Sequence, residues 1–130
     1  MIVGTEWLIE ASGCDVIKLR DETAVRNVIS AVISQLGLKA VGSVWHKFEG
    51  EGGLTGLIAL TESHLACHTY PEHGIATFNL YCCRTRPEWD WPTNLQLLLG
   101  ATIVYVKKIE RGTTEARISN LRFETAGVDA

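Results

Sequence analysis

The stretch LTESHLACHTYPEHGIATFNLYCCR, residues 60–84, holds the features that decide the fold of this chain. It predicts a short strand around 65–70, a turn at Pro71-Glu72-His73-Gly74 and a second strand over 75–83. A connection this short joins strands that run antiparallel. The same stretch contains one serine, three histidines and three cysteines. Because polar groups buried without partners are costly, we expect these side chains to carry the chemistry of the protein.

The sequence on either side of this hairpin supplies the rest of one layer of strands and one layer of helices. The expected elements are strands over residues 4–11, 40–48, 54–61 and 101–110, a helix over 22–36, and a second helix ending at Leu99-Gly100. Strands in hairpin order, with two helices between them, predict an α+β two-layer sandwich: an antiparallel sheet with two helices on one face. After Arg111 the pattern fades, and we expect a weakly ordered or peripheral tail.

The second face of such a sheet needs a cover. Alternation along residues 4–11 places Glu6, Leu8 and Glu10 on one face, opposite three apolar side chains. Two helices on one side leave the other side solvated or paired with another subunit. We therefore expect a homodimer or a higher assembly built from it.

The composition of the chain argues against two classes of binding partner, nucleic acids and membranes. The 130 residues form one expected domain, 1–130, with a net charge of −3 and a pI near 5.8, which gives no basic surface for nucleic acid. No apolar run approaches the roughly 18 residues of a membrane helix, so we expect no membrane partner and a cytoplasmic protein. The four cysteines do not have the spacing of a disulfide framework, and free thiols are expected.

Ser63 has several possible roles when its sequence neighbours are considered alone. It can be a polar residue at a strand end. A serine-hydrolase nucleophile requires Gly-x-Ser-x-Gly before a helix, and Thr61-Glu62-Ser63-His64-Leu65 does not match. A metal site on His64 and His68 is disfavoured, because four residues along a strand separate them by about 13 Å. No metal is predicted.

The central run resembles the bacterial-type S-adenosylmethionine decarboxylase family. The residues that carry the resemblance are Glu62-Ser63-His64-Leu65, His68-Thr69-Tyr70-Pro71-Glu72 and Cys83, with matching spacing. Upstream, Val44-Trp45-His46-Lys47-Phe48 and Leu54-Thr55-Gly56 are similar to further motifs of the family. The resemblance covers roughly residues 4–110.

This resemblance implies that Ser63 is the precursor of a covalent cofactor. In the family the serine cuts its own chain after the glutamate and becomes a pyruvoyl group, which here implies fragments 1–62 and 63–130. Thr55 stands where the family has a serine that supports processing, and His68 matches its acid or base. Cys83 matches the proton donor of the decarboxylation. The ketone of the group would bind the α-amine of the substrate and accept the electrons released with carbon dioxide.

The departures from the family pattern lie around the substrate. Glu6 stands where the family usually has histidine, and Asn79-Leu80-Tyr81-Cys82-Cys83-Arg84 replaces Asp-x-(Tyr/Phe)-Thr-Cys-Gly. We expect Phe48, Glu6 and Glu10 to contact substrate, with Trp45 as a further stacking face for adenine. The implied substrate is a small molecule with an α-amino acid group: S-adenosylmethionine, for spermidine and polyamine biosynthesis, or alternatively L-arginine or L-ornithine. A non-catalytic relative and a small-molecule binding module remain open alternatives.

Overall fold

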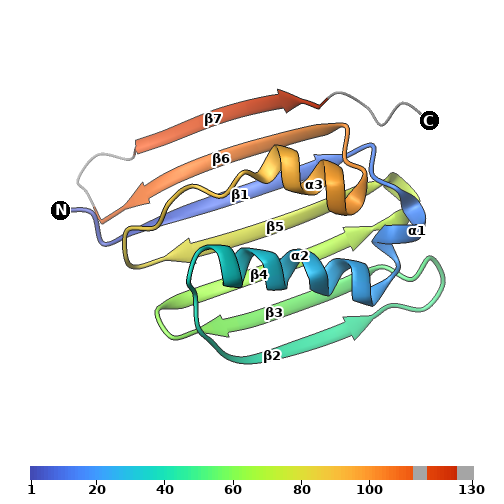
Figure 1. The fold of residues 1–130 in the computed structure, drawn as a ribbon, viewed down its shortest axis with the longest axis horizontal. Coiled ribbons are helices and arrows are strands. Elements are labelled where there is room, and N and C mark those ends of the chain that lie inside the picture. Colours follow the sequence, from blue (N-terminus) through green and yellow to red (C-terminus); the bar gives the residue numbers. More distant parts are fainter. Residues whose placement is uncertain (113–116, 126–130) are drawn as a thin grey trace.

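Residues 1–112 and 117–125, which a computed structural model describes, form a seven-stranded antiparallel sheet in the order β2-β3-β4-β5-β1-β6-β7 (Figure 1). The strands are β1 (Gly4–Ser12), β2 (Ala40–Lys47), β3 (Leu54–Leu60), β4 (Ser63–Tyr70), β5 (Ile75–Cys82), β6 (Ile103–Arg111) and β7 (Arg117–Glu124). The helices are α1 (Val16–Leu19), α2 (Glu22–Gln35) and α3 (Trp91–Leu99), with a 3₁₀ turn η1 at Pro71–His73.

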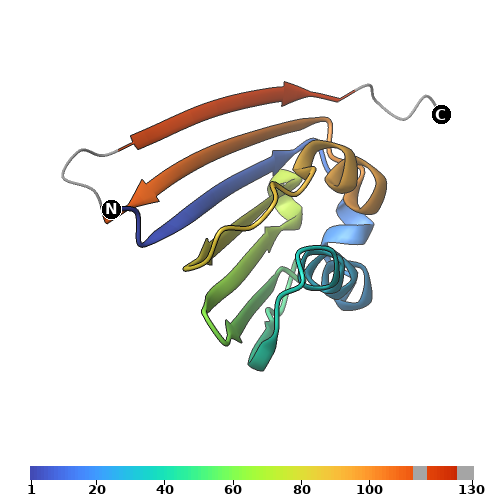
Figure 2. The same cartoon turned by 60° about the vertical axis from the view of Figure 1, so that its left-hand side comes forward.

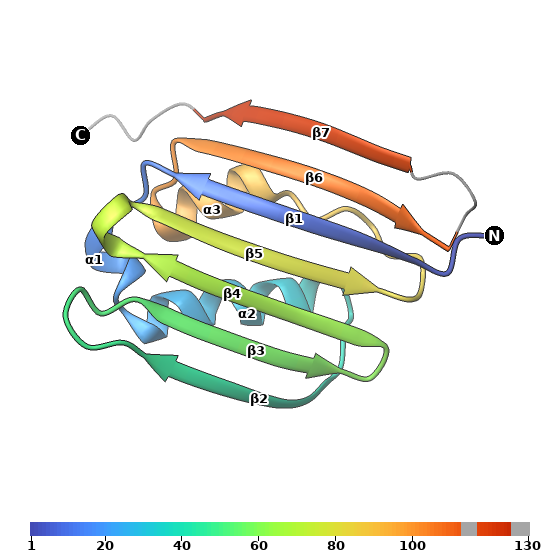
Figure 3. The same cartoon turned by 180° about the vertical axis from the view of Figure 1, so that it is seen from behind.

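The helices cover one face of the sheet, and the predicted two-layer α+β sandwich is confirmed (Figures 1 and 2). Figure 3 shows the opposite face, with no helix over it. The core lies between the layers. Val28 of α2, Leu95 of α3 and Leu65 of β4 are fully buried there, and Leu80 of β5 is 1% exposed. The face without helices is called the open face below.

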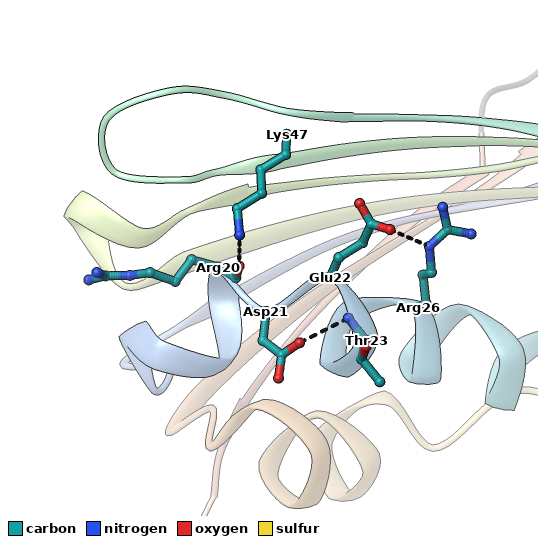
Figure 4. A network of polar contacts seen from close by, with 6 residues as sticks. All are labelled: Arg20, Asp21, Glu22, Thr23, Arg26 and Lys47. Atoms are coloured by element: carbon teal, nitrogen blue, oxygen red, sulfur yellow. Dashed lines mark hydrogen bonds and ion pairs between the residues drawn. The ribbon is translucent and has the colours of Figure 1, made fainter.

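Helix α2 begins where its sequence predicts. The carboxylate of Asp21 accepts a hydrogen bond from the Thr23 backbone N–H at 3.0 Å, which satisfies one of the free donors of the first turn (Figure 4). Lys47 Nζ donates to the Arg20 carbonyl oxygen at 2.7 Å and so ties edge strand β2 to the start of the helix. Gly37, with φ of 64°, follows the last turn in the left-handed conformation that glycine adopts without strain.

The β4–β5 hairpin pairs Ser63 with Cys82 at its open end and Tyr70 with Ile75 at its turn. The turn is a 3₁₀ turn closed by Gly74 at φ of 65°, where the sequence predicts a type I turn. Strand β4 starts at Ser63, two residues before the predicted start, so the serine belongs to the sheet.

The structure contains two elements beyond those expected from the sequence. Residues 117–124, expected to be a weakly ordered or peripheral tail, form β7, which pairs with β6 along its whole length. Every residue of β7 is exposed, so it is a peripheral strand without the alternation that would have identified it. The four-residue helix α1 is also additional to the two predicted helices, being too short to show a period. Residues 113–116 and 126–130 of the expected tail lie outside the described residues.

In the described ranges, no helix is long and apolar enough to cross a membrane.

Candidate active site

Ser63 opens strand β4 directly opposite Cys82 of β5. It shares its side of the strand with the buried residues Leu65 and Cys67, so its side chain lies toward the helix layer. Burial raises the pKa of the Cys82 thiol, while the positive charge of Arg86 and a hydrogen bond with Ser63 lower it to a smaller extent. Cys82 is therefore a protonated thiol beside the Ser63 hydroxyl at neutral pH.

Glu62, which precedes the serine, is held by two arginines from the segment after β5. Arg84 Nε lies 3.0 Å from Glu62 Oε1, and Arg86 Nη2 lies 3.4 Å from Glu62 Oε2. These two ion pairs anchor the Glu62 side chain at the β3–β4 turn, next to the Glu62-Ser63 bond. Neither contact was expected from the sequence. The signal for them is weak: Arg84 stands where the family pattern has glycine, and Arg86 lies two residues beyond that pattern.

Thr55 and His68 come together on the open face. They are register partners across β3 and β4, and Thr55 Oγ1 lies 3.0 Å from His68 Nδ1. A hydroxyl that contacts a histidine ring nitrogen fixes which nitrogen is available for acid–base chemistry. The two residues expected to support processing thus form one unit.

That unit lies far from Ser63 of the same chain. His68 follows Ser63 by five residues along one strand, which corresponds to about 16 Å at about 3.3 Å per residue. The odd spacing also places the two side chains on opposite faces of the sheet. A histidine acting directly on the serine must come within about 3 Å of it, so His68 does not reach Ser63 within one chain.

The open face carries a hollow of about 440 Å³, a volume typical of small-molecule sites. It is lined by Leu8, Ile9, Glu10, Ala66, His68, Thr77, Phe78, Asn79, Tyr105 and Lys107. Beside it, Asn79 Nδ2 donates to Glu6 Oε2 at 2.8 Å, and Asn79 Oδ1 lies 2.9 Å from His64 Nε2. Since the Glu6 carboxylate only accepts, it turns the amide oxygen of Asn79 toward His64, and His64 Nε2 carries the proton.

The comparisons with known proteins agree with these motifs. The family model described as S-adenosylmethionine decarboxylase matches residues 5–112. The chain belongs to this family. A similar protein is the S-adenosylmethionine decarboxylase proenzyme of Prochlorococcus marinus (strain MIT 9313), which is 35% identical over 127 residues, 96% of this chain and 100% of the relative.

Other members of the S-adenosylmethionine decarboxylase family are similar over most of the chain. The proenzyme 2 of Halalkalibacterium halodurans is 32% identical over 111 residues, covering 85% of this chain and 87% of the relative. The crystal structure of the adenosylmethionine decarboxylase from Aquifex aeolicus superposes with a TM-score of 0.73 at 26% identity, covering 88% of this chain and 94% of that one.

The remaining residues expected from the family pattern are dispersed. Cys83 is exposed just beyond β5, in a second hollow with Thr5 and Trp7. Glu10 lines the open-face hollow, whereas Glu6 is engaged by Asn79 and, at 3.6 Å, by Arg111.

The two aromatic residues expected to stack on adenine lie away from the hollow. Phe48 is exposed after β2, edge-on to His46 with ring centroids 4.6 Å apart. Trp45 packs on the helix side of β2, with the Arg26 guanidinium 4.5 Å from its ring centroid. Within a single chain, Trp45 is therefore a packing residue.

In residues 1–112 and 117–125, no group of three or more His, Cys, Asp or Glu side chains is arranged to hold a metal ion.

Proposed function

We propose that this chain is the precursor of a pyruvoyl-dependent S-adenosylmethionine decarboxylase, matured by self-cleavage between Glu62 and Ser63. The observation that carries the proposal is the Glu62-Ser63 bond itself, held at the β3–β4 turn in a member of a family whose similar relatives are named proenzymes. The product, decarboxylated S-adenosylmethionine, would serve spermidine and polyamine biosynthesis.

The cleavage is chemistry of the chain alone. Ser63 Oγ attacks the carbonyl carbon of Glu62, and the acyl group moves from nitrogen to oxygen. Elimination then breaks the Cβ–Oγ bond of residue 63, so that Oγ leaves as part of a new carboxylate on Glu62. One water enters at residue 63 and ammonia leaves, which makes the residue pyruvoyl. The fragments are 1–62 and 63–130, and no oxidant is consumed.

The surroundings of Ser63 fit this conversion. A cavity of about 10 Å³, enough for about one water-sized group, is lined by Glu62, Ser63, Cys82 and Arg86 among others. The half-buried position limits competing attack by solvent on the scissile carbonyl. Once formed, the group supplies a ketone that accepts electrons during decarboxylation.

The separation of Ser63 from His68 supports a homodimer. In an isologous two-fold pair, the same surface of each subunit meets its counterpart, so a residue that cannot reach Ser63 in its own chain can reach that of the partner. The open face has no helix over it, and Val44 and Leu57 are exposed there on neighbouring strands. We therefore propose that two chains pair through the open face and that the Thr55–His68 pair of one subunit supports cleavage at the β3–β4 turn of the other. His68 must reach that turn around the end of the sheet, because the Ser63 side chain lies on the helix side.

The open-face hollow supports a substrate that carries a positive charge away from its α-amino acid group. Glu10 offers a carboxylate that suits such a charge, the sulfonium of S-adenosylmethionine, whereas the α-amine must react at the pyruvoyl group of residue 63. S-adenosylmethionine is favoured over L-arginine and L-ornithine because it is the substrate named in the relatives. Glu6 would contribute through Asn79 and His64, and Phe48 would contact substrate in the assembled dimer.

Two neighbouring cysteines compete for the role of proton donor. The motif spacing assigns Cys83, and its exposure leaves it accessible to a bound substrate. Cys82 is buried beside Ser63, as a small apolar packing residue would be, and we assign it no step in either reaction. We propose Cys83 as the donor.

The test of the activity is carbon dioxide release from the purified protein with each of three substrates labelled at the carboxyl carbon. The expected result is release from S-adenosylmethionine and none from arginine or ornithine. Release from arginine or ornithine alone would overturn the substrate and leave the cleavage chemistry in place. A chain that neither cleaves nor releases carbon dioxide from any of them would favour a non-catalytic relative or a small-molecule binding module.

A further inference from the structure

The two arginines that hold Glu62 differ in their surroundings. The Arg86 side chain is 23% exposed and that of Glu62 is 27% exposed, whereas Arg84 is 75% exposed. Arg86 also donates from Nη1 to the Leu36 carbonyl oxygen at 3.3 Å, which anchors it to the end of α2. An exposed ion pair contributes little, so Arg86 is the main partner of Glu62 and Arg84 an outer one.

The charges of this cluster are unbalanced before cleavage. Two guanidinium groups face one carboxylate, so one positive charge is in excess. Cleavage adds one carboxylate, on the α-carbon of the same Glu62. The new carboxylate therefore balances the charges of Glu62, Arg84 and Arg86, and the excess cation among these three side chains is matched by the charge that the reaction creates.

Before cleavage, the cluster also has a hydrogen-bond donor without a partner and a small cavity beside it. Arg86 Nε is buried and has no hydrogen-bond partner among the described residues, which is uncommon for a charged donor. The cavity of about 10 Å³ that Arg86 lines is bounded by both residues of the scissile bond, Glu62 and Ser63. A cavity of this size admits about one oxygen-sized group.

We propose that Arg86, assisted by Arg84, is the binding site for the α-carboxylate that self-cleavage leaves on Glu62. This inference rests on the proposed function, since it requires the cut at Ser63. One oxygen of that carboxylate is the former Ser63 Oγ. Arg86 is a positioning residue: it keeps the new C-terminus at the end of β3 and thereby holds the two fragments in register beside residue 63. Without it, cleavage would place an unpaired charge in a half-buried turn.

The test is a two-by-two comparison of thermal unfolding. Arg86→Gln is made in the cleavable chain and in the Ser63→Ala chain, which stays intact. A residue that merely packs or holds Leu36 stabilises both forms equally. A site for the new carboxylate stabilises the cleaved form more, and we expect Arg86→Gln to lower its unfolding midpoint by about 2–5 °C more than that of the intact form. Equal losses in both forms would overturn the proposal.

Two controls sharpen the comparison. Arg26→Gln removes another arginine that is paired with a glutamate, Glu22, at 3.0 Å but lies on α2, and its effect should not depend on cleavage (Figure 4). Arg84→Gln should also lower the unfolding midpoint of the cleaved form more than that of the intact form, but by less than Arg86→Gln does.

A second measurement needs no arginine variant. Added salt should lower the unfolding midpoint of the cleaved wild type relative to Ser63→Ala, because salt screens the pairing of the new carboxylate. The same salt response in both proteins would contradict the proposal, even if Arg86→Gln blocked cleavage. A wild-type chain that never cleaves would overturn the proposed function and this inference together, whereas a cleaved wild type with equal losses would overturn this inference alone.

Discussion

The two ends of strand β4 differ in almost every physical respect. At its start, Ser63 lies toward the helix layer, beside a buried thiol and a glutamate fixed by arginines. Near its other end, His68 lies on the open face with Thr55 and lines the open-face hollow. In our proposal the first end holds the bond to be broken, and the second holds the acid–base groups. Because one strand cannot bring them together, we propose that the reactive unit is a pair of chains.

The largest expected effect comes from substituting the two ends of β4 in different chains. Ser63→Ala should abolish cleavage, and His68→Ala should slow it by about 10²–10⁴-fold. When the two variants are expressed together, the His68→Ala chain should be cleaved, since its intact Ser63 meets His68 of the Ser63→Ala chain. Intact-mass analysis measures this. Failure of the mixture to cleave would break the assignment of the two ends to different subunits.

The next effect concerns the two adjacent cysteines beside the Ser63 end. Cys83→Ala should still cleave and should lose about 10²–10⁴-fold in decarboxylation rate, as expected for removal of a proton donor. Cys82→Ala should retain most of both activities. Rates of carbon dioxide release per cleaved chain decide this, and a larger loss in Cys82→Ala would move the proton donor to the thiol beside Ser63.

Substituting one leucine on each face of the sheet compares how much the two faces contribute to the free energy of unfolding. Leu65 on β4 is fully buried against the helices, and Leu57 on β3 is 49% exposed on the open face. Leu65→Ala should cost about 2–5 kcal/mol of unfolding free energy, as for core leucines. Leu57→Ala should cost far less in the monomer and should weaken dimerisation, seen by sedimentation at several concentrations. Unchanged dimerisation would place the interface elsewhere.

The smallest effect is a pH dependence confined to the helix side of the sheet. Burial raises the pKa of Cys67 to about 12 and that of Cys14 to about 11. An unfolded thiol loses its proton first, so the unfolded state binds fewer protons above about pH 9, and stability should fall from there toward pH 12. Urea unfolding should show a shallower fall for Cys67→Ala. An identical slope in that variant would contradict the burial of this thiol.

The sequence predicts the fold well where apolar residues repeat with a clear period. The stripe of α2, with Val25, Val28, Ile29 and Val32, is buried as expected, and the β4–β5 hairpin forms around its turn. Strand β7 could not be predicted, because no side of it is buried. Helix α1 spans a single turn, in which a period cannot be recognised.

The sequence predicts the residues of the proposed site by name, and it does not predict how they are arranged. The spacing of Thr55 and His68 gives their pairing once the β3–β4 register is known, and that register depends on the turn length. The contact of Arg86 with Glu62 joins residues 24 apart through an irregular segment, where the sequence gives no rule for direction. The distance between Ser63 and His68 follows from strand geometry, yet their closeness in sequence suggests the opposite.

The central claim is that the chain is cut between Glu62 and Ser63, and intact-mass analysis of the purified protein under denaturing conditions tests it most directly. The account predicts two chains, residues 1–62 with a free carboxylate at Glu62 and residues 63–130 beginning with a pyruvoyl group that blocks Edman sequencing. A single 130-residue chain that persists after long incubation, with serine still at position 63, would contradict it.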